Sequence, residues 1–378
     1  MRVARITVAL AAAFALTLAW SPALSGQPGA GQATGTAQGT ATGQAGAAGQ
    51  GQRQGGAGGQ RQGGAGNAAA GPLDPFAMAA NAVKLVDPAT LEYGPPKGTL
   101  IIIGGGNANG TGLMEKFIEL AGGAENGKFV VFPTNNGNRD NDGKLINYDP
   151  ETVLRSWKGG TRNLKNVVMM HTADPKVADT EEFVKPLLDA TGVWFDGGRQ
   201  WNMVDSYKGT RTEREIKNVL ARGGVTAGSS AGATIQGDYL WRGDTSGPNV
   251  LMTKEPTHQQ AFALLKNVAI DQHINTRNRW WDLEEGMKEW KGKYLGIGLS
   301  EGTGIIVNGD RFEVLGRWKV AIHDHTYVHQ PWEMPWYVLS QGDVYNMRTR
   351  KVEKYGIGNI IPPTPGGRGG RGGGGGER

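Results

Sequence analysis

The sequence predicts an α/β fold in which a three-layer, doubly wound and mostly parallel sheet ends in antiparallel strands. Between residues 98 and 235, short apolar runs alternate with stretches whose apolar residues recur at helical spacing. This alternation is typical of parallel strands that are covered by helices on both faces. Further along, the turn Asn308-Gly309-Asp310 separates two apolar runs and indicates an antiparallel hairpin.

Each expected element rests on the period of its apolar residues. Residues 100–103 are apolar throughout, as in strands buried on both faces, whereas Ile216, Val219 and Leu220 share one side of a helix. The expected strands are 98–103, 128–134, 167–171, 192–195, the run before Ser229, 268–273, 294–299, 304–307 and 312–315. The expected helices are 111–120, 152–157, 180–190, 212–222 and 280–290.

Glycine-rich turns follow three of the expected strands, at residues 104–106, 197–198 and 228–232. In parallel sheets the functional groups gather at the carboxyl ends of the strands, so we expect a site at these turns. The run at 104–106 lacks the spacing of a dinucleotide-binding turn and of a P-loop. We therefore predict no nucleotide site and no cofactor.

The chain divides by composition into four segments. Residues 1–25 have a charged start, a short apolar middle and a small-residue exit, which predicts an export signal; a retained N-terminal anchor is the alternative. Residues 26–71 and 362–378 are Gly-rich and almost free of large apolar side chains, so we expect them to be disordered. Residues 72–361 form the expected α/β domain. We predict a secreted or periplasmic protein with no membrane contact beyond the signal.

The formal net charge of +5 misrepresents the expected domain. Residues 1–72 contain four arginines and no acidic residue, and the tail has three arginines against Glu377. The domain itself therefore has a charge of −1, which argues against a nucleic-acid partner. The chain has no cysteine, so thiolate nucleophiles, thiolate metal sites and iron–sulfur clusters are excluded.

The strongest motif is Gly228-Ser229-Ser230-Ala231-Gly232, between an apolar run and a helix-like stretch. A nucleophilic serine on a sharp strand-to-helix turn needs very small residues two positions away on either side. Ser230 has Gly228 and Gly232 at these positions, whereas Ser229 is less well cleared by its two alanines. The same turn directs the N–H of Ala231 toward a developing oxyanion. The plainer alternative is a connecting turn with no chemistry.

A nucleophilic serine needs a base, and His273 is the best candidate among six histidines. His273 follows an apolar run and is surrounded in sequence by polar groups, although a strand-end histidine bonded to the backbone is the alternative. His323, His325 and His329 lie near one another in sequence, but no carboxylate is convincingly placed with them. We therefore predict no metal site.

Four ordered motifs resemble cyanophycinases and the wider dipeptidase E family of serine peptidases. The motifs are 195–200 (FDGGRQ), 227–233 (AGSSAGA), 271–273 (DQH) and 296–301 (GIGLSE), within a similarity that extends over about residues 98–324. The resemblance implies a fold related to class I glutamine amidotransferases. It also implies Ser230 as nucleophile, His273 as general base and Glu301 as the group that orients the base.

The resemblance further implies a set of binding residues. Gly198 and Ala231 would give the oxyanion N–H groups, and the residues that would hold a β-linked aspartyl–arginine unit are Gln200, Asp271, Arg277 and Arg279. A β-aspartyl peptide has a free α-carboxylate beside the scissile amide, and a guanidinium fork is suited to bind it. The alternative for Arg277 and Arg279 is a pair of solvated surface charges.

The chain departs from the cyanophycinase pattern at three places. Asp196 and Arg199 flank the two glycines, where cyanophycinases usually have a threonine before them and no arginine after. Residues 280–282 (WWD) replace a further arginine, and residues 238–265 form a long polar insertion. The tryptophans either wall a different pocket or pack a helix onto the sheet. These departures affect the identity of the substrate and leave the expected triad complete.

We therefore predict an exported serine peptidase that hydrolyses β-aspartyl (isoaspartyl) peptides through an acyl-enzyme, with cyanophycin as the named candidate. An α-aspartyl dipeptidase and a non-catalytic, amidotransferase-like binding domain are the alternatives. The expected partner is a peptide substrate of the β-Asp-Arg type, and a homodimer is left open.

Overall fold

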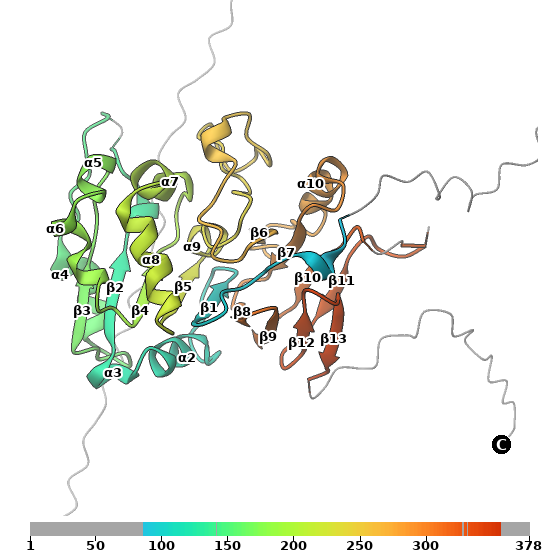
Figure 1. Cartoon of the computed structure of the whole chain (residues 1–378), viewed down its shortest axis with the longest axis horizontal. Helices are drawn as coiled ribbons and strands as arrows, with labels where there is room; N and C mark the ends of the chain where they lie inside the picture. Colours follow the sequence, from blue (N-terminus) through green and yellow to red (C-terminus); the bar gives the residue numbers. More distant parts are fainter. Residues whose placement is uncertain (1–85, 141, 327–328, 331, 357–378) are drawn as a thin grey trace, which may run out of the picture. The chain divides into compact units, whose positions relative to one another are not determined.

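The structure is a computed structural model that describes residues 86–356, except 141, 327–328 and 331. Figure 1 shows these residues with their elements labelled. The predicted signal (1–25), the Gly-rich segment (26–71) and the C-terminal tail (362–378) lie outside the described residues. The predicted domain of 72–361 is therefore described over all but its two ends.

Within the described residues, nine strands form the larger sheet, in the order β13-β12-β9-β8-β1-β5-β4-β2-β3. Five neighbouring strands are parallel: β1 (Thr99–Ile103), β5 (Val225–Ser229), β4 (Gly192–Phe195), β2 (Lys128–Phe132) and β3 (Asn166–Met169). The other four are antiparallel: β8 (Thr303–Asn308), β9 (Arg311–Gly316), β12 (Val344–Asn346) and β13 (Lys351–Lys354). The predicted fold class is confirmed.

Both faces of β1, β4 and β5 are buried, and their successive residues alternate between two apolar cores, whereas β3 at the edge of the sheet has one exposed face. In β1, Leu100 and Ile102 belong to one core, and Ile101 and Ile103 belong to the other. The parallel register pairs Ile103 with Ser229 at the carboxyl ends of β1 and β5. This register places the end of β1 beside the serine turn.

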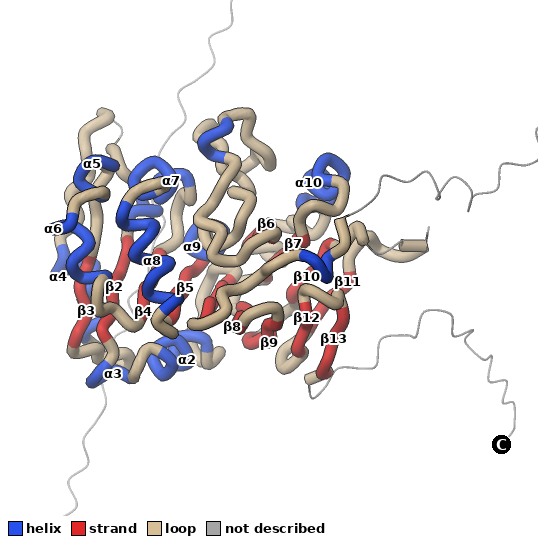
Figure 2. The backbone as a smooth tube through the Cα atoms, in the orientation of Figure 1, coloured by secondary structure: helices blue, strands red, loops and turns tan. Residues whose placement is uncertain are grey.

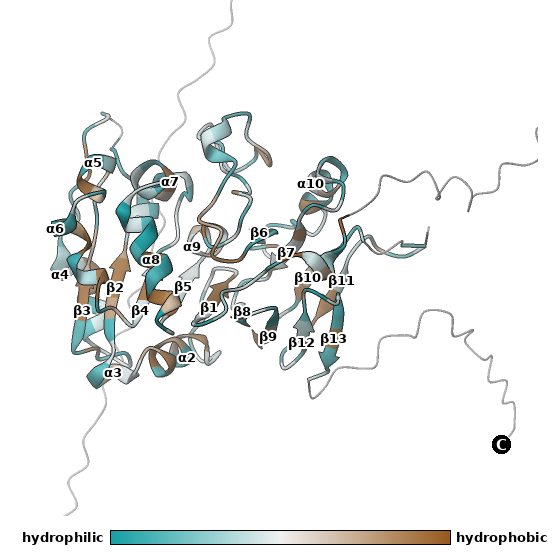
Figure 3. Ribbon diagram, in the orientation of Figure 1, coloured by the Kyte–Doolittle hydropathy of each residue, from teal (hydrophilic) through white to brown (hydrophobic). Residues whose placement is uncertain are grey.

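Helices cover the two faces of the parallel strands. The helices are α2 (Leu113–Leu120), α3 (Gly123–Asn126), α4 (Pro150–Lys158), α5 (Pro175–Ala178), α6 (Glu181–Val184), α7 (Trp201–Tyr207), α8 (Arg211–Ala221), α9 (Ala231–Thr234) and α10 (Asp282–Trp290). Apolar residues of α7 and α8 join the first core, and those of α2 and α4 join the second. Figure 3 shows hydrophobic residues concentrated on the strands and hydrophilic residues on the outward side of α8.

A second sheet was not predicted. β6 (Val268–Gln272) and β7 (Leu295–Leu299) are parallel and continue into antiparallel β10 (Val320–His323) and β11 (Tyr337–Leu339). The strands expected at 268–273 and 294–299 therefore exist, but they do not join the large sheet. Alternate residues of β7 pack into the first core, while Gly296 on its other face leaves room for Met287 of α10. Residues buried on both faces do not reveal which sheet they join.

Three further differences have local causes. The helix expected at 180–190 is α6 followed by the 3₁₀ turn η3 (Lys185–Leu187), since Pro186 interrupts regular helical hydrogen bonding. Helix α7 was missed, although Met203, Val204 and Tyr207 recur at helical spacing. The insertion 238–265 is mostly loop, with one 3₁₀ turn, η4 (Pro256–His258) (Figure 2). Two further 3₁₀ turns are η1 (Pro88–Thr90) and η2 (Thr134–Asn136).

Among the described residues, no helix has the length and apolarity that a bilayer span needs.

Candidate active site

Ser230 occupies a strained turn between β5 and α9. Its φ of 59° and ψ of −116° lie outside the regions that non-glycine residues usually adopt. A Cβ atom at residue 228 would lie 2.2 Å from the carbonyl oxygen of Gly232, and one at residue 232 would lie 2.1 Å from that of Phe195. Even a methyl group is therefore excluded at either glycine. Ser229 is instead the last residue of β5, within the sheet.

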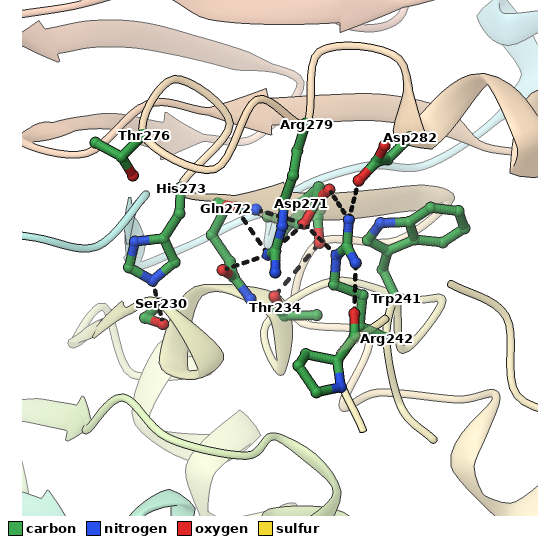
Figure 4. A network of polar contacts seen from close by, with 12 residues as sticks. Ser230, Thr234, Trp241, Arg242, Asp271, Gln272, His273, Thr276, Arg279 and Asp282 are labelled. Atoms are coloured by element: carbon green, nitrogen blue, oxygen red, sulfur yellow. Dashed lines mark hydrogen bonds and ion pairs between the residues drawn. The ribbon is translucent and has the colours of Figure 1, made fainter. Parts of the chain in front are cut away.

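Ser230, His273 and Glu301 form one hydrogen-bonded chain. The hydroxyl oxygen of Ser230 lies 2.7 Å from Nε2 of His273, and Nδ1 of His273 lies 2.6 Å from Oε1 of Glu301. Figure 4 shows the imidazole directed at Ser230. The three residues follow β5, β6 and β7, so the two sheets meet at this point. The structure thus brings together the three residues that the sequence selected.

The electrostatics keep His273 neutral and Glu301 ionised near neutral pH. Burial lowers the pKa of His273 below its ordinary value; the hydrogen bond with Glu301 opposes this shift, and the charges of Arg277 and Arg279 add to it. Burial alone would raise the pKa of Glu301, but hydrogen bonds from His273 and Thr276 outweigh it, and the pKa is lowered. A neutral imidazole beside a carboxylate is suited to accept the serine proton.

Residues 104–106 support the base and its carboxylate partner, a role that the sequence did not reveal. The N–H of His273 donates to the carbonyl oxygen of Gly104 at 2.8 Å. A Cβ atom at residue 105 would lie 2.2 Å from Cε1 of His273, and one at residue 106 would lie 2.5 Å from Oε2 of Glu301. Both glycines have positive φ, as does His273 at 57°. Residues 104–106 therefore pack closely against the side chains of His273 and Glu301.

Two residues that the sequence analysis missed hold Glu301 in place. The hydroxyl of Thr276 donates to Oε1 of Glu301 at 2.8 Å, and the N–H of Glu301 donates to the side-chain oxygen of Asn275 at 2.9 Å. Both residues lie within three positions of His273 in the sequence, and this proximity was the only sequence feature that could have indicated their role.

The two predicted oxyanion donors are the N–H groups of Gly198, which precedes Ser230 in the sequence, and of Ala231, which follows it directly. Ala231 is the first residue of α9, so its N–H has no partner within the helix. Gly198 has a φ of 127°, and a Cβ atom there would lie 2.0 Å from the carbonyl oxygen of Asn135. Its neighbour Gly197 packs against the Cβ atom of Ser230. The turn at 197–198 therefore lies beside the serine.

A cavity of about 380 Å³ opens at Ser230. Four arginines and no acidic residue line this cavity. The lining residues are Asn135, Asn136, Gly198, Arg199, Gln200, Ser230, Arg242, Pro248, Gln272, Arg277 and Arg279. A second cavity of about 560 Å³ shares Arg242, Pro248, Arg277 and Arg279 with it. The lining suits an anionic ligand.

The predicted binding residues differ in their access to this cavity. Arg277 is exposed and lines both cavities, and Arg279 lines both but is only 8% exposed. Gln200 lines the first cavity, with its side-chain N–H groups bonded to the carbonyl oxygens of Trp241 and Arg242 at 2.6 and 2.8 Å.

Asp271 requires a correction, because it does not contact the cavity. Its side chain is fully buried and forms ion pairs with Arg242 at 3.0 Å and with Arg279 at 3.7 Å. Arg242 also pairs with Asp282, and these contacts form the network drawn in Figure 4. Buried charges of this kind must be paired. Asp271 thus positions two arginines of the wall, and Arg242 is a lining residue that the sequence analysis missed.

The other histidines and the tryptophans lie away from Ser230. His323 and His325 both contact the carboxylate of Glu284, at 2.5 and 2.9 Å. In the part of the chain that the structure describes, no group of three or more His, Cys, Asp or Glu side chains is arranged to hold a metal ion. Trp281 packs edge-on against Trp336 and, like Trp280, lines neither cavity at the serine.

The chain is similar in sequence to known peptidases. Residues 100–315 match Peptidase family S51. The chain is 27% identical over 314 residues to a cyanophycinase of Synechococcus elongatus, which covers 77% of this chain and 92% of that protein. It is 24% identical over 277 residues to a cyanophycinase of Geminocystis herdmanii, which covers 68% of this chain and 96% of that protein. A crystal structure of a peptidase from an acI-B1 actinobacterium has a TM-score of 0.48 and 20% identity, over 67% of this chain and 98% of that one.

The family match extends over more than half of the chain and includes all three residues of the hydrogen-bonded chain at Ser230. The chain therefore belongs to peptidase family S51 and is a serine-type peptidase.

Proposed function

We propose that the protein hydrolyses β-aspartyl (isoaspartyl) peptide bonds through an acyl-enzyme, with Ser230 as nucleophile, His273 as general base and Glu301 as the residue that orients His273. One observation carries the proposal, namely the continuous chain of short contacts from the Ser230 hydroxyl through the imidazole to the Glu301 carboxylate. A hydroxyl, a neutral imidazole and an ionised carboxylate in this order are the parts that serine acyl transfer needs.

The proposed reaction has two halves. Oγ of Ser230 attacks the scissile carbonyl carbon while Nε2 of His273 takes its proton, and the N–H groups of Gly198 and Ala231 stabilise the oxyanion. His273 then gives this proton to the leaving nitrogen, the C–N bond breaks, and an ester on Ser230 remains. A water molecule, deprotonated by His273, then attacks the ester carbon. The C–O bond to Ser230 breaks, His273 returns the proton to Oγ of Ser230, and the acid is released. Glu301 stays ionised and stabilises the imidazolium in both halves.

The arginines support a substrate with a carboxylate near the scissile bond. A β-aspartyl residue has a free α-carboxylate and, at a peptide N-terminus, an α-ammonium on the same carbon. Arg277 and Arg279 line the cavity beside His273 and are suited to bind the carboxylate. Asn135 lines the same cavity, and its buried side-chain oxygen has no hydrogen-bond partner among the described residues. Because Asn135 is fully buried, its side chain would have to turn toward the cavity before this oxygen accepted a hydrogen bond from the α-ammonium.

Cyanophycin is the named candidate because the cyanophycinases to which the chain is similar align over most of its length. We also propose that the protein is exported to the periplasm or beyond, on the strength of the charged and apolar start of the sequence. Cell fractionation, with N-terminal sequencing of the mature chain, tests the export. A homodimer remains a prediction.

A substrate panel tests the proposed reaction. Matched pairs of β-Asp-Xaa and α-Asp-Xaa peptides are incubated with wild type and with Ser230→Ala, and the released amino acids are quantified. We expect release from the β-linked peptides by the wild type alone. Release from the α-linked members only would indicate an α-aspartyl dipeptidase, and release from neither, with tight peptide binding, would indicate a binding domain.

A further inference from the structure

Two of the arginines that line the Ser230 cavity, Arg199 and Arg277, come from different segments of the chain. Arg277 comes from the wall after β6, which also supplies His273. Arg199 comes from the wall formed by the segments after β2 and β4, together with Asn135 and Gly198. In the strand order, β4 and β2 lie on the side of β5 away from β1, and His273 is bonded to the turn after β1. Arg199 and Arg277 therefore belong to the two parts of the lining that meet at Ser230.

The backbone at Arg199 is held firmly. Its N–H donates to the carbonyl oxygen of Asn135 at 2.6 Å, and Gly198 before it has no room for a side chain. The guanidinium lies 5.5 Å from the ring centroid of Trp201. Trp201 thus limits the directions that the side chain can take.

Arg199 and Arg277 differ from the other two arginines of the cavity in their charge balance. Asp271 and Asp282 neutralise Arg242, and Asp271 also faces Arg279. The guanidinium groups of Arg199 and Arg277 form no ion pair or hydrogen bond with any residue that the structure describes. The cavity has no acidic residue in its lining, so these two arginines have no ion-pair partner there, although the charge of Arg277 interacts with Glu301 at longer range.

This charge pattern bears on the residue that leaves when the bond is cut. If Arg277 and Arg279 bind the α-carboxylate of the β-aspartyl residue, Arg199 is on the side of the leaving residue. An arginine in the leaving position would meet two like charges and no free carboxylate. A leaving residue with a carboxylate would instead gain a charge-assisted hydrogen bond from Arg199.

We propose that Arg199 is a specificity-determining residue that selects β-aspartyl substrates whose leaving residue has an acidic side chain over substrates whose leaving residue has a basic side chain. This proposal rests on the proposed hydrolysis of β-aspartyl bonds but departs from cyanophycin as the substrate, because it predicts that β-Asp-Arg units are poor substrates relative to acidic β-aspartyl peptides.

The test compares kcat/KM for β-Asp-Glu, β-Asp-Gln and β-Asp-Arg, each with a free and an amidated C-terminus. The wild type should prefer β-Asp-Glu to β-Asp-Arg by at least about tenfold, the value of one charge-assisted hydrogen bond. Arg199→Gln should reduce that preference to within about threefold, and Arg199→Lys should retain part of it. A loss that follows Glu against Gln supports a contact of Arg199 with the side-chain carboxylate, and a loss that follows only the C-terminal amide overturns the proposal.

Arg155→Gln is the matched control, because Arg155 is an exposed arginine of α4 outside both cavities. It should keep the wild-type preference. A wild type that prefers β-Asp-Arg, or an Arg199→Gln variant whose preference is unchanged, overturns the proposal.

A binding measurement separates this proposal from the proposed function. Calorimetry on Ser230→Ala, with and without Arg199→Gln, reports the affinity for the same peptides without turnover. If the wild type cleaves no β-aspartyl peptide, the proposed function fails. The role of Arg199 then stands only if its substitution still weakens binding of the acidic peptides selectively, and equal binding of acidic and basic peptides refutes it.

Discussion

The imidazole of His273 occupies the space in which a side chain at residue 105 would lie. A Cβ atom at Gly105 would be 2.2 Å from Cε1 of His273 and 2.7 Å from both ring nitrogens. The glycine is therefore needed for the geometry of the base rather than for a bound phosphate. Gly105 also has a φ of 102°, which residues other than glycine rarely adopt. The site therefore requires glycine here both for its backbone conformation and for its lack of a side chain.

Gly105→Ala should lower kcat about 100-fold or more, because the new methyl group displaces the imidazole from Ser230 and small displacements of catalytic groups are costly. Gly223→Ala is the matched control. Gly223 has a similar φ of 93°, but a Cβ atom there meets nothing within 4 Å. The control therefore adds the same backbone strain without the clash. Equal loss of kcat in the two variants would contradict this explanation.

Asp271→Asn should destabilise the fold by about 1.5–3 kcal/mol, because it removes charged hydrogen-bond partners from the buried guanidinium of Arg242, which then keeps only Asp282 as a counter-charge. Urea denaturation monitored by tryptophan fluorescence measures the change in the free energy of unfolding. An unchanged unfolding midpoint with a raised KM would show instead that Asp271 contacts the substrate, as the resemblance first implied.

The acid limb of the kcat/KM profile should lie below pH 6.5, the ordinary value for histidine, because burial lowers the pKa of His273 and only the neutral imidazole is a base. Glu301→Gln removes a group that raises this pKa, so the limb should move to lower pH while kcat falls. Arg277→Gln removes a group that lowers it, so the limb should move to higher pH.

These opposite shifts are measured with a substrate that both variants still bind, over a range of pH in which the fold is intact. Arg155→Gln should leave the limb in place. Shifts of the same sign in the two variants would show that the limb does not report His273.

Glu284→Gln should lower the free energy of unfolding near neutral pH by about 1.5–3 kcal/mol, because the buried carboxylate joins His323 and His325. Burial opposes ionisation of Glu284, but these hydrogen bonds outweigh it and lower its pKa from 4.5 to about 2. The stabilisation is therefore present above pH 4.5 and is lost as the pH falls toward 2.

The difference in thermal midpoint between wild type and Glu284→Gln should accordingly narrow on acidification from about pH 5 to about pH 3. A difference that stays constant over this range would mean that the ionised carboxylate does not stabilise the fold.

Local patterns in the sequence were sufficient to predict the parallel strands and the serine turn. The run before Ser229 and the glycines at 228 and 232 determine the turn by short-range sterics, so no tertiary information was needed. The positions of His273 and Glu301 followed from their place after strands and from the resemblance. Their contacts depend on the meeting of two sheets, which the sequence did not predict.

The features that the sequence did not predict depend on contacts between residues far apart in the chain. β6 and β7 have the apolar composition of central strands, and only their tertiary pairing assigns them to a second sheet. Gly105 lies far from His273 in sequence, so its purpose could not be inferred from its own neighbours. The resemblance assigned Asp271 to substrate binding, whereas its burial and its ion pair with Arg242 of the insertion depend on tertiary contacts.

The most direct test of the central claim is to find the residue that becomes acylated. The protein is treated with a fluorophosphonate, digested and sequenced by mass spectrometry. The adduct should lie on Ser230, be absent from Ser230→Ala and form at least about 100-fold more slowly in His273→Ala. An adduct on Ser229, or hydrolysis of peptides that survives Ser230→Ala, would contradict the account.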